Sequence, residues 1–366
     1  MPGLANFGRF RCLDWGSVRE SAKSCQNAAT RGSRGGVFSP PVEPAYFDPV
    51  PLRTYALLDS GHGEKLERFG DMTLRRPDPQ ALWRPRLPES QWDKADASFE
   101  RDPDSGGRGG RWRPHVKAPR AMRGERPEWR IDILGGTFWI RPAAFKHVGL
   151  FPEQATNWRY LQLLRKEFGA SPPRLLNLFG YSGAASVLAA QAGYEVTHVD
   201  ASKQAIRWAA ENAEASGLPQ RSMRVLCDDA LGFVQREGRR KSRYDVILLD
   251  PPHFGRGPKG EKWQLEDGLA PLLESVRAIV SERALVILST YAVGYSPLAF
   301  RNLFTDWGTG EVAVGELVLR EREHTGGDGA GSVAPRLLPA GFCARWGREL
   351  PLLLESDPSR SLESDS

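Results

Sequence analysis

The sequence lacks any run of about 18 apolar residues, the length that a membrane-spanning helix requires, so we predict no membrane contact. Cysteine is scarce, and the four residues, Cys12, Cys25, Cys227 and Cys343, are scattered without a CxxC or Cys/His ligand spacing. A disulfide framework and a structural zinc site are therefore disfavoured, and we predict no bound metal. These absences suit a reducing compartment.

The chain of 366 residues, 40% hydrophobic and 26% charged, is long enough for one large domain and a smaller one. Its net charge of +5 is unevenly placed. Residues 1–150 hold 25 Lys/Arg against 18 Asp/Glu, whereas residues 151–366 hold 25 against 27. The basic front half indicates either a polyanionic partner or a solvated, Arg-rich segment, and charge alone does not separate the two.

Residues 1–45 hold six basic and three acidic residues, with much Ser, Gly and Ala and little periodicity. We interpret them as a disordered or targeting extension, although Asp14 and Glu20 are unusual in an organellar transit peptide. We therefore predict a cytoplasmic protein, with a mitochondrion or plastid as the alternative. Residues 351–366 are predicted to be a polar tail.

Residues 46–150 are predicted to form a small, basic, β-rich segment with hairpins. Short apolar pieces alternate with turn residues over 55–74, and residues 129–141 predict a hairpin that turns at Gly135-Gly136. Four tryptophans lie among arginines in this segment: Trp83, Trp92, Trp112 and Trp129. Such tryptophans either stack on unpaired nucleic-acid bases or anchor loops onto neighbouring surfaces.

Residues 151–350 are predicted to form the larger domain. After a helix over 153–168, strand and helix alternate regularly, which indicates a mainly parallel sheet with helices on both faces. The strands are expected near 174–179, 195–199, 223–227, 244–249 and 284–289, and the helices near 184–192, 203–215, 230–239 and 268–281. Late strands near 312–320 and 341–346 predict an antiparallel end.

The motif at the centre of this domain is the stretch Asn177-Leu-Phe-Gly-Tyr-Ser-Gly183. A strand leads into it and a helix follows, so Gly180 and Gly183 belong to a tight turn where backbone can approach a ligand. Three apolar strands each end in an acid, namely Asp200, Asp228 (followed by Asp229 and Ala230) and Asp250. One such acid is often a helix N-cap. Three along one edge, beside a glycine turn, indicate a nucleoside site.

The expected cofactor has an adenosine but no phosphate. The chain contains no GxxxxGK[ST] motif, and Leu178 stands where the dinucleotide motif G-x-G-x-x-G would have its first glycine. S-adenosylmethionine fits this description. An NAD-dependent oxidoreductase is the alternative class.

The stretch Asp250-Pro251-Pro252-His253-Phe254 follows the fourth strand directly. A residue before proline is driven to extended geometry, so Asp250 should continue the strand and project over the sheet edge. The prolines stiffen the turn and supply carbonyls without competing N–H donors. Such rigid acceptors suit the in-line positioning that methyl transfer requires.

Together these motifs resemble the class I S-adenosylmethionine-dependent methyltransferases, and within them the large-subunit ribosomal RNA enzymes that act on cytosine C5 or guanine N7. The resemblance covers roughly residues 130–320, and it implies a Rossmann-like, seven-stranded sheet and RNA, ribosomal RNA above all, as substrate. The catalytic residues that it implies are Asp250, Pro251, Pro252 and His253. The implied cofactor-binding residues are Asn177, Phe179, Gly180, Tyr181, Ser182, Gly183, Asp200, Ala201, Asp228, Asp229, Ala230 and Asp250.

The chain departs from that family in two places. The cytosine-C5 branch has a nucleophilic cysteine after the fifth strand, where this chain has Ser289-Thr290-Tyr291-Ala292, so we predict direct transfer to nitrogen or oxygen. Residues 50–110 do not resemble the branch's small RNA-binding domain, which leaves a protein or small-molecule acceptor as the alternative. The predicted substrate-binding residues are Lys146, just before the larger domain, and Arg256 and Lys259, in a glycine-containing basic loop.

Overall fold

The computed structural model describes residues 45–102, 109–124, 126–143, 146–291, 294–324 and 333–352. By internal contacts the chain divides into Met1–Glu43 and Pro44–Ser366, and every described residue belongs to the second unit. The predicted extension over 1–45 and the tail over 351–366 therefore fall outside the described residues, apart from Ala45, Pro351 and Leu352. The predicted division near residue 150 stays a prediction.

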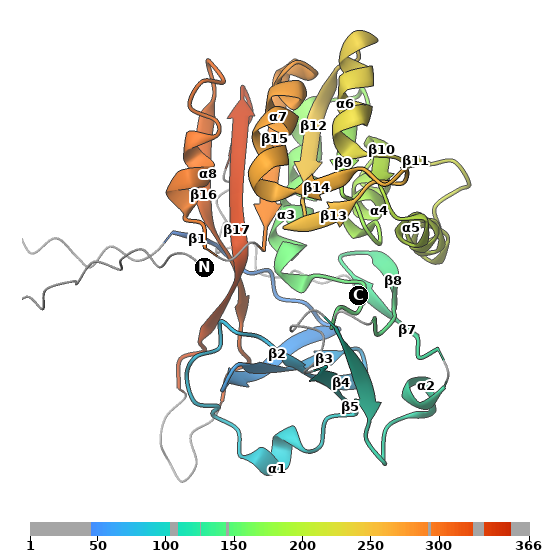
Figure 1. The fold of residues 1–366 in the computed structure, drawn as a ribbon, viewed down its shortest axis with the longest axis vertical. Helices are drawn as coiled ribbons and strands as arrows, with labels where there is room; N and C mark the ends of the chain where they lie inside the picture. The colour runs from blue at the N-terminus through green and yellow to red at the C-terminus, as the bar shows by residue number, and fades with distance from the viewer. Residues whose placement is uncertain are drawn as a thin grey trace, which may run out of the picture. The chain divides into compact units, whose positions relative to one another are not determined.

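An eight-stranded sheet in the order β1-β16-β17-β15-β12-β9-β10-β11 forms the larger part of this unit (Figure 1). Five neighbouring strands are parallel: β9 (Arg174–Leu178), β10 (Glu195–Asp200), β11 (Met223–Cys227), β12 (Tyr244–Leu249) and β15 (Val280–Thr290). β17 (Leu337–Arg348) lies antiparallel between β15 and β16 (Glu311–Arg320). The predicted seven-stranded sheet is confirmed. The eighth strand, β1 (Tyr46–Phe47), was not predicted and pairs with β16.

Helices cover both faces of this sheet, as predicted. Leu175 and Val246 belong to one buried cluster, while the next residues, Leu176 and Ile247, belong to the other. The first cluster includes α3 (Ala155–Leu164) and α4 (Ala184–Gln191), and the second includes α6 (Ala230–Arg239), α7 (Leu265–Arg277) and α8 (Pro297–Asn302). α5 (Lys203–Ala215) packs against α4, β10 and β11. Burial on both faces explains why the central strands are continuous apolar runs.

Several predicted element boundaries shift: α7 ends at Arg277 rather than near 281, β15 begins at Val280 rather than near 284, and β17 is longer than the predicted 341–346. The helix expected over 153–168 is a run of η3 (Pro152–Gln154), α3 and η4 (Arg165–Phe168). α7 begins at Leu265, three residues before the predicted start at Gly268. Gly268 lies within the helix, where the Trp263 ring leaves no room for a side chain: a Cβ on Gly268 would lie 2.6 Å from that ring. Trp263 belongs to β14 (Lys262–Gln264), which pairs with β13 (Phe254–Arg256) and makes a hairpin of the expected basic loop.

The front segment forms a second, five-stranded sheet in the order β2-β3-β4-β5-β6. Its strands are β2 (Tyr55–Gly61), β3 (Glu64–Phe69), β4 (Met72–Pro77), β5 (Ala97–Arg101) and β6 (Gly110–Pro114), with the short helices α1 (Glu89–Trp92) and α2 (Arg120–Arg123) in the connections. The predicted hairpin consists of β7 (Trp129–Ile133) and β8 (Gly136–Ile140). Its turn is Leu134-Gly135, one residue earlier than predicted, because these two residues have the positive φ angles, 51° and 89°.

The four front-segment tryptophans anchor loops and strands. Each indole N–H donates to an acceptor within this part of the chain: Trp83 to Ser60 O, Trp92 to Asp59, Trp112 to Ala143 O and Trp129 to Phe69 O. Trp92 is fully buried, and Trp112 packs edge-on against Phe99. The structure therefore favours the anchoring interpretation over stacking on bases.

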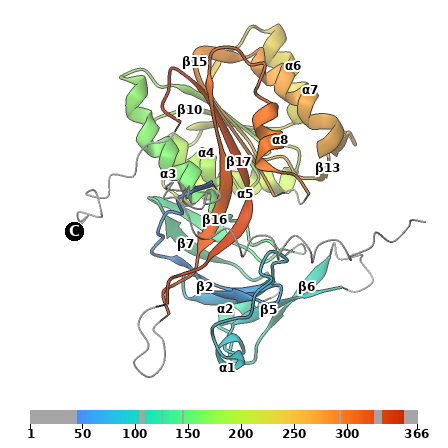
Figure 2. The ribbon, with the colours of Figure 1, turned by 90° about the vertical axis from the view of Figure 1, so that its left-hand side faces the viewer.

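The two sheets are joined by β16 and β17, which run from the large sheet to the small one (Figure 2). At this junction Arg336 donates to Asp59 and to Glu321, each at 2.8 Å, and Ser60 also donates to Glu321. Asp59, Glu321 and His324 bring potential metal ligands within 4.8 Å of one another. Because Arg336 already bonds both carboxylates, we interpret the group as a buried ion-pair network. Among the described residues, no helix is long and apolar enough to span a membrane.

Candidate active site

The register of the parallel strands places the predicted site residues side by side at the carboxyl edge of the large sheet. Leu178, the last residue of β9, is the register partner of both Val199 and Leu249. The residues that follow these positions are Phe179, Asp200 and Asp250, so they emerge side by side at the carboxyl edge. Asp200 pairs in turn with Cys227, which places Asp228 next along the same edge. The predicted convergence of the three acids is therefore observed.

The turn after β9 holds strained backbone. Phe179 and Tyr181 are not glycines but have φ angles of 56° and 48°, in the left-handed region. Gly180, between them, leaves no room for a side chain, because a Cβ would lie 2.3 Å from the His198 ring of β10. Strain of this kind persists where surrounding structure enforces it, and it concentrates at ligand-binding turns.

A buried polar network supports the turn from beneath. Asn177 donates to Ser186 at 2.8 Å, and Ser186 is 2.9 Å from Nδ1 of His198. Burial lowers the pKa of His198 to about 4, so its ring is neutral at physiological pH. The network fixes the glycine turn against β10 and α4.

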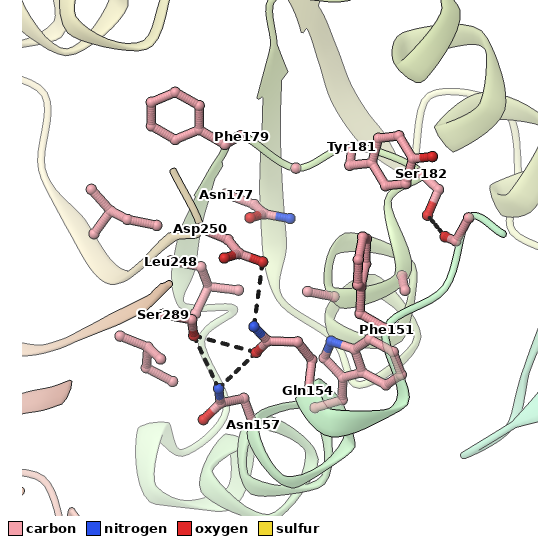
Figure 3. A pocket seen from close by; sticks show the side chains of 17 residues that line it. Phe151, Gln154, Asn157, Asn177, Phe179, Tyr181, Ser182, Leu248, Asp250 and Ser289 are labelled. Atoms are coloured by element: carbon pink, nitrogen blue, oxygen red, sulfur yellow. Dashed lines mark hydrogen bonds between the residues drawn. The ribbon is translucent and has the colours of Figure 1, made fainter. Parts of the chain in front are cut away.

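A small cavity of about 80 Å³ lies beside the turn (Figure 3). Six predicted residues line it: Asn177, Phe179, Gly180, Tyr181, Ser182 and Asp250. Gln154, Asn157 and Ser289, which sequence reasoning did not assign, line it as well. Asn157 and Ser289 carry no local sequence signal.

A larger cleft of about 540 Å³ shares five lining residues with this cavity, namely Phe151, Gln154, Phe179, Tyr181 and Asp250. Its other lining residues from the prediction are Lys146, Asp200, Ala201, Asp228, Asp229, Ala230, Pro251, Pro252, His253 and Arg256. Gly183 and Lys259 line neither space. A Cβ on Gly183 would meet Ala209 of α5, and Lys259 is exposed, with its backbone N–H bonded to Glu261.

The three strand-end acids have different partners. Asp200 accepts hydrogen bonds from the backbone N–H groups of Tyr181 at 2.9 Å and Ser202 at 2.8 Å, while burial raises its pKa. Asp228 forms an ion pair with Arg236. Asp229 caps α6 by accepting from the backbone N–H of Gly232 at 2.8 Å. Asp229 thus follows the ordinary capping pattern, and Asp200 is held firmly at the turn.

Asp250 is exposed to solvent within the cleft, whose walls partly desolvate its carboxyl group. This desolvation, together with the nearby Glu153 carboxylate, raises the pKa of Asp250 to about 7. Gln154 acts in the opposite direction by donating from Nε2 to Oδ2 of Asp250 at 3.3 Å (Figure 3). The carboxyl group can therefore exchange a proton near neutral pH.

Part of the cleft wall comes from the front sheet, which sequence reasoning did not connect to the site. Lys65, Arg76 and Asp78 line it, and Lys65 pairs with Asp78 at 3.3 Å. Lys146 donates to the carbonyl of Pro77 at 3.1 Å, and burial lowers its pKa to about 8. Burial likewise lowers the pKa of His147 to about 3. The cleft thus combines strand-end acids on one side with cations on the other.

The β13–β14 hairpin is fastened to the Asp-Pro-Pro segment. Trp263 donates from its indole N–H to the carbonyl of Pro252 at 2.7 Å and packs against Phe179 with ring centroids 4.9 Å apart. His253 is bonded to Glu266 through Nε2 at 2.6 Å. These contacts tie the segment to the hairpin and to α7, and its predicted rigidity stays a prediction.

The described cysteines lie outside the cleft. Cys343 is fully buried in β17, and burial raises the pKa of its thiol. Cys227 donates to the carbonyl of Ala201 at 3.4 Å and lines neither the cavity nor the cleft. Neither is placed as a nucleophile.

The fold and the site define a Rossmann-like domain with a nucleoside-type site at its carboxyl edge, and known proteins share it. The crystal structure of the SAM-dependent methyltransferase from Agrobacterium tumefaciens matches with a TM-score of 0.74 at 44% identity, over 83% of this chain and 93% of that one. The chain therefore belongs to the S-adenosylmethionine-dependent methyltransferases. This membership sets aside the oxidoreductase alternative.

Two further comparisons are more limited. The family described as "Conserved hypothetical protein 95" matches residues 160–289. The "Ribosomal RNA large subunit methyltransferase K/L" of Methylococcus capsulatus is 28% identical over 162 residues, and that of Shewanella frigidimarina is 30% identical over 170 residues. Each match covers 44% of this chain, but the chain spans only 21% and 23% of those two proteins.

Proposed function

We propose that this methyltransferase acts on RNA, ribosomal RNA above all, by direct methyl transfer to a nitrogen or oxygen atom. The observation that carries the proposal is the shared position of Asp250, which borders both the small cavity beside the glycine turn and the large cleft. The cleft volume of about 540 Å³ falls within the range for small-molecule sites and leaves space for an acceptor group. The shared segment with relatives named as ribosomal RNA methyltransferases supports RNA as the acceptor.

The lining residues fit S-adenosylmethionine. When bound, this cofactor supplies an electrophilic methyl group on a sulfonium. Gly180, against which no side chain fits, would lie close to the methionine part, next to Asn177. Asp200 keeps acceptor capacity for the ribose hydroxyls beyond its two backbone bonds. Asp228 and Ala230 would border the adenine.

Asp250 would act on the acceptor. An acceptor nitrogen or oxygen attacks the methyl carbon, the new bond forms as the carbon–sulfur bond breaks, and S-adenosylhomocysteine leaves. The acceptor's proton, where it has one, passes to Asp250 or to water. A carboxyl with a pKa near 7 can accept that proton and orient the donor group. Lys146 and Arg256 line the cleft where a charged acceptor would enter, so they remain proposed substrate contacts.

The position of the cysteines supports direct transfer. A covalent mechanism needs a thiolate at the acceptor, and neither described cysteine lines the cleft. Ser289, in the place where the cytosine-C5 branch has its nucleophile, is buried and bonded to Gln154 and Asn157. We also propose a cytoplasmic location. The organellar alternative depends on residues 1–45, outside the described part.

The test is mass-spectrometric nucleoside analysis of RNA incubated with the purified protein and S-adenosylmethionine that carries a deuterated methyl group. We expect label in one methylated nucleoside, and Asp250→Ala should lower its yield at least about 100-fold while S-adenosylhomocysteine binding persists. Label found in protein digests but not in RNA would contradict the RNA proposal. Full activity of Asp250→Ala would remove Asp250 from the mechanism.

A further inference from the structure

Arg345 of β17 is a buried guanidinium, with 3% of its surface exposed. It lies between the rings of Phe47 and Tyr160, 4.3 and 4.1 Å from their centroids. Among the described residues no carboxylate forms an ion pair with it. Burial of a cation without an acidic neighbour costs free energy, so the hydrogen bonds that Arg345 donates are important for its stability in the core.

The principal partner of Arg345 is one side-chain oxygen. Nε and Nη2 donate to Oδ1 of Asn157 at 3.2 and 2.8 Å, and Nη1 donates to the carbonyl of Leu352 at 3.2 Å. An arginine can only donate, so this atom of Asn157 must be the oxygen. The amide N–H₂ of Asn157 must then point the other way, toward Gln154.

The same logic fixes the next link. Nδ2 of Asn157 donates to Oε1 of Gln154 at 2.8 Å, and Ser289 donates to the same oxygen at 3.3 Å (Figure 3). With its oxygen occupied by donors, Gln154 presents Nε2 to Asp250 at 3.3 Å. Amide orientations are usually assigned from the network alone. Here the Arg345 guanidinium determines the amide orientations of both Asn157 and Gln154.

We propose that Arg345, Asn157 and Gln154 form a directional hydrogen-bond relay that holds the Asp250 carboxylate in position, with Gln154 as a positioning residue for methyl transfer. This proposal rests on the role of Asp250 in the proposed function. Its residues come from three distant parts of the chain, namely η3–α3, the residue directly after β12, and β17, which explains why no sequence motif indicates it.

The relay acts against an otherwise unfavourable environment for the Asp250 anion. Burial and the Glu153 carboxylate raise the pKa of Asp250, and the Gln154 N–H lowers it. Other charged or titratable groups that line the same cleft are Lys65, Arg76, Asp78, Lys146, His147, Tyr181, Asp200, Asp228, Asp229, His253, Arg256 and Tyr291. If Gln154 turns its oxygen toward Asp250, the pKa of Asp250 should rise, because only the protonated carboxyl can bond to that oxygen.

The matched pair Arg345→Lys and Arg345→Met tests the relay. Both variants lose the guanidinium fork, but only lysine can still donate to Asn157. We expect the pKa of Asp250 to rise by about one unit in Arg345→Met and to stay near the wild-type value in Arg345→Lys. The measurement is a ¹³C NMR titration of aspartate carboxyl groups in the free protein, with the Asp250 signal assigned from Asp250→Asn. Equal shifts in the pair, or no shift in either, would overturn the relay.

Asn157→Asp is the second variant, and it tests the relay even if Arg345→Met does not fold. An aspartate at this position still accepts from Arg345 but cannot donate to Gln154, so Gln154 should reverse and the pKa of Asp250 should rise by about one unit or more. An unchanged pKa would overturn the proposal. Tyr160→Phe is the control: it removes the hydroxyl that bonds the Pro351 carbonyl and should lower stability without shifting Asp250.

The NMR titration of Asp250 tests the relay independently of the proposed function. The titration needs neither cofactor nor acceptor, so its result stands even if RNA is not the substrate. In the activity assay, a raised pKa of Asp250 should move the acidic limb of the kcat profile to higher pH by the same amount in Asn157→Asp. A lowered kcat with an unmoved limb would mean that Asn157 is merely structural.

Discussion

Gly180 is constrained at the level of single atoms by His198. A methyl group on Gly180 would lie 2.3 Å from Cε1 and 2.5 Å from Nδ1 of that ring, so Gly180→Ala must displace a buried side chain. We expect a loss of about 1–3 kcal/mol in the free energy of unfolding, measured in urea, and weaker S-adenosylhomocysteine binding by calorimetry.

The double variant Gly180→Ala/His198→Ala should recover part of that binding, because the small side chain removes the clash. Gly124→Ala is a matched control: Gly124 has a φ of −74°, and the nearest atom to an added Cβ is 4.0 Å away. It should unfold like the wild type. A Gly180→Ala protein with unchanged stability and affinity would contradict the steric explanation.

At the scale of elements, the β13–β14 hairpin depends on Trp263. Trp263→Phe keeps an aromatic ring against Phe179 but leaves the Pro252 carbonyl without its 2.7 Å donor. We expect a loss of about 1 kcal/mol in stability and a several-fold weaker affinity for S-adenosylhomocysteine, because the hairpin and the Asp-Pro-Pro segment both line the cleft.

Trp129→Phe separates these two effects. Trp129 also donates its indole N–H to a carbonyl, that of Phe69 at 2.9 Å, but it lies in β7 and does not line the cleft. It should lose similar stability and keep its affinity. Equal affinities in the two variants would mean that the hairpin does not contribute to the cofactor site.

The elements that sequence reasoning predicted well are those with local signals. β10 ends in Asp200 and the apolar end of β12 is followed by Asp250, and parallel pairing with β9 brings the two acids together. The residues that it missed depend on long-range packing. Asn157 and Arg345 are 188 positions apart, and the cleft wall formed by Lys65 and Arg76 belongs to a sheet whose position no periodicity encodes. The start of α7 was predicted too late, at Gly268. This glycine lies inside the helix, where it makes room for the Trp263 ring.

At the scale of the whole described unit, Arg336 joins the two sheets. Its guanidinium bonds Asp59 and Glu321, whose side chains are both fully buried. Arg336→Ala would leave the buried Asp59 without an ion-pair partner and Glu321 with only Arg86, at 3.7 Å, and we expect a loss of about 3–5 kcal/mol in a single unfolding transition. Chemical denaturation followed by tryptophan fluorescence measures it.

The control for Arg336 is an exposed pair. Arg113 contacts Glu100 in the small sheet, and both side chains are about half exposed, so Arg113→Ala should cost at most about 1 kcal/mol. Two separate transitions in Arg336→Ala would show that the small sheet can unfold on its own. A cost no larger than that of Arg113→Ala would contradict the importance of the junction.

The run of β16 and β17 from one sheet to the other has a consequence for the shape of an acceptable acceptor. These two strands hydrogen-bond within the large sheet and bridge to the small one, and Leu317 of β16 and Ala340 of β17 line the same cleft as Asp250. In the proposed reaction on RNA, a base stacked inside a duplex would offer only its edge to this cleft. We therefore expect the target nucleotide to come from an unpaired loop, or to be extruded from its helix, so that its methyl-accepting atom can reach Asp250.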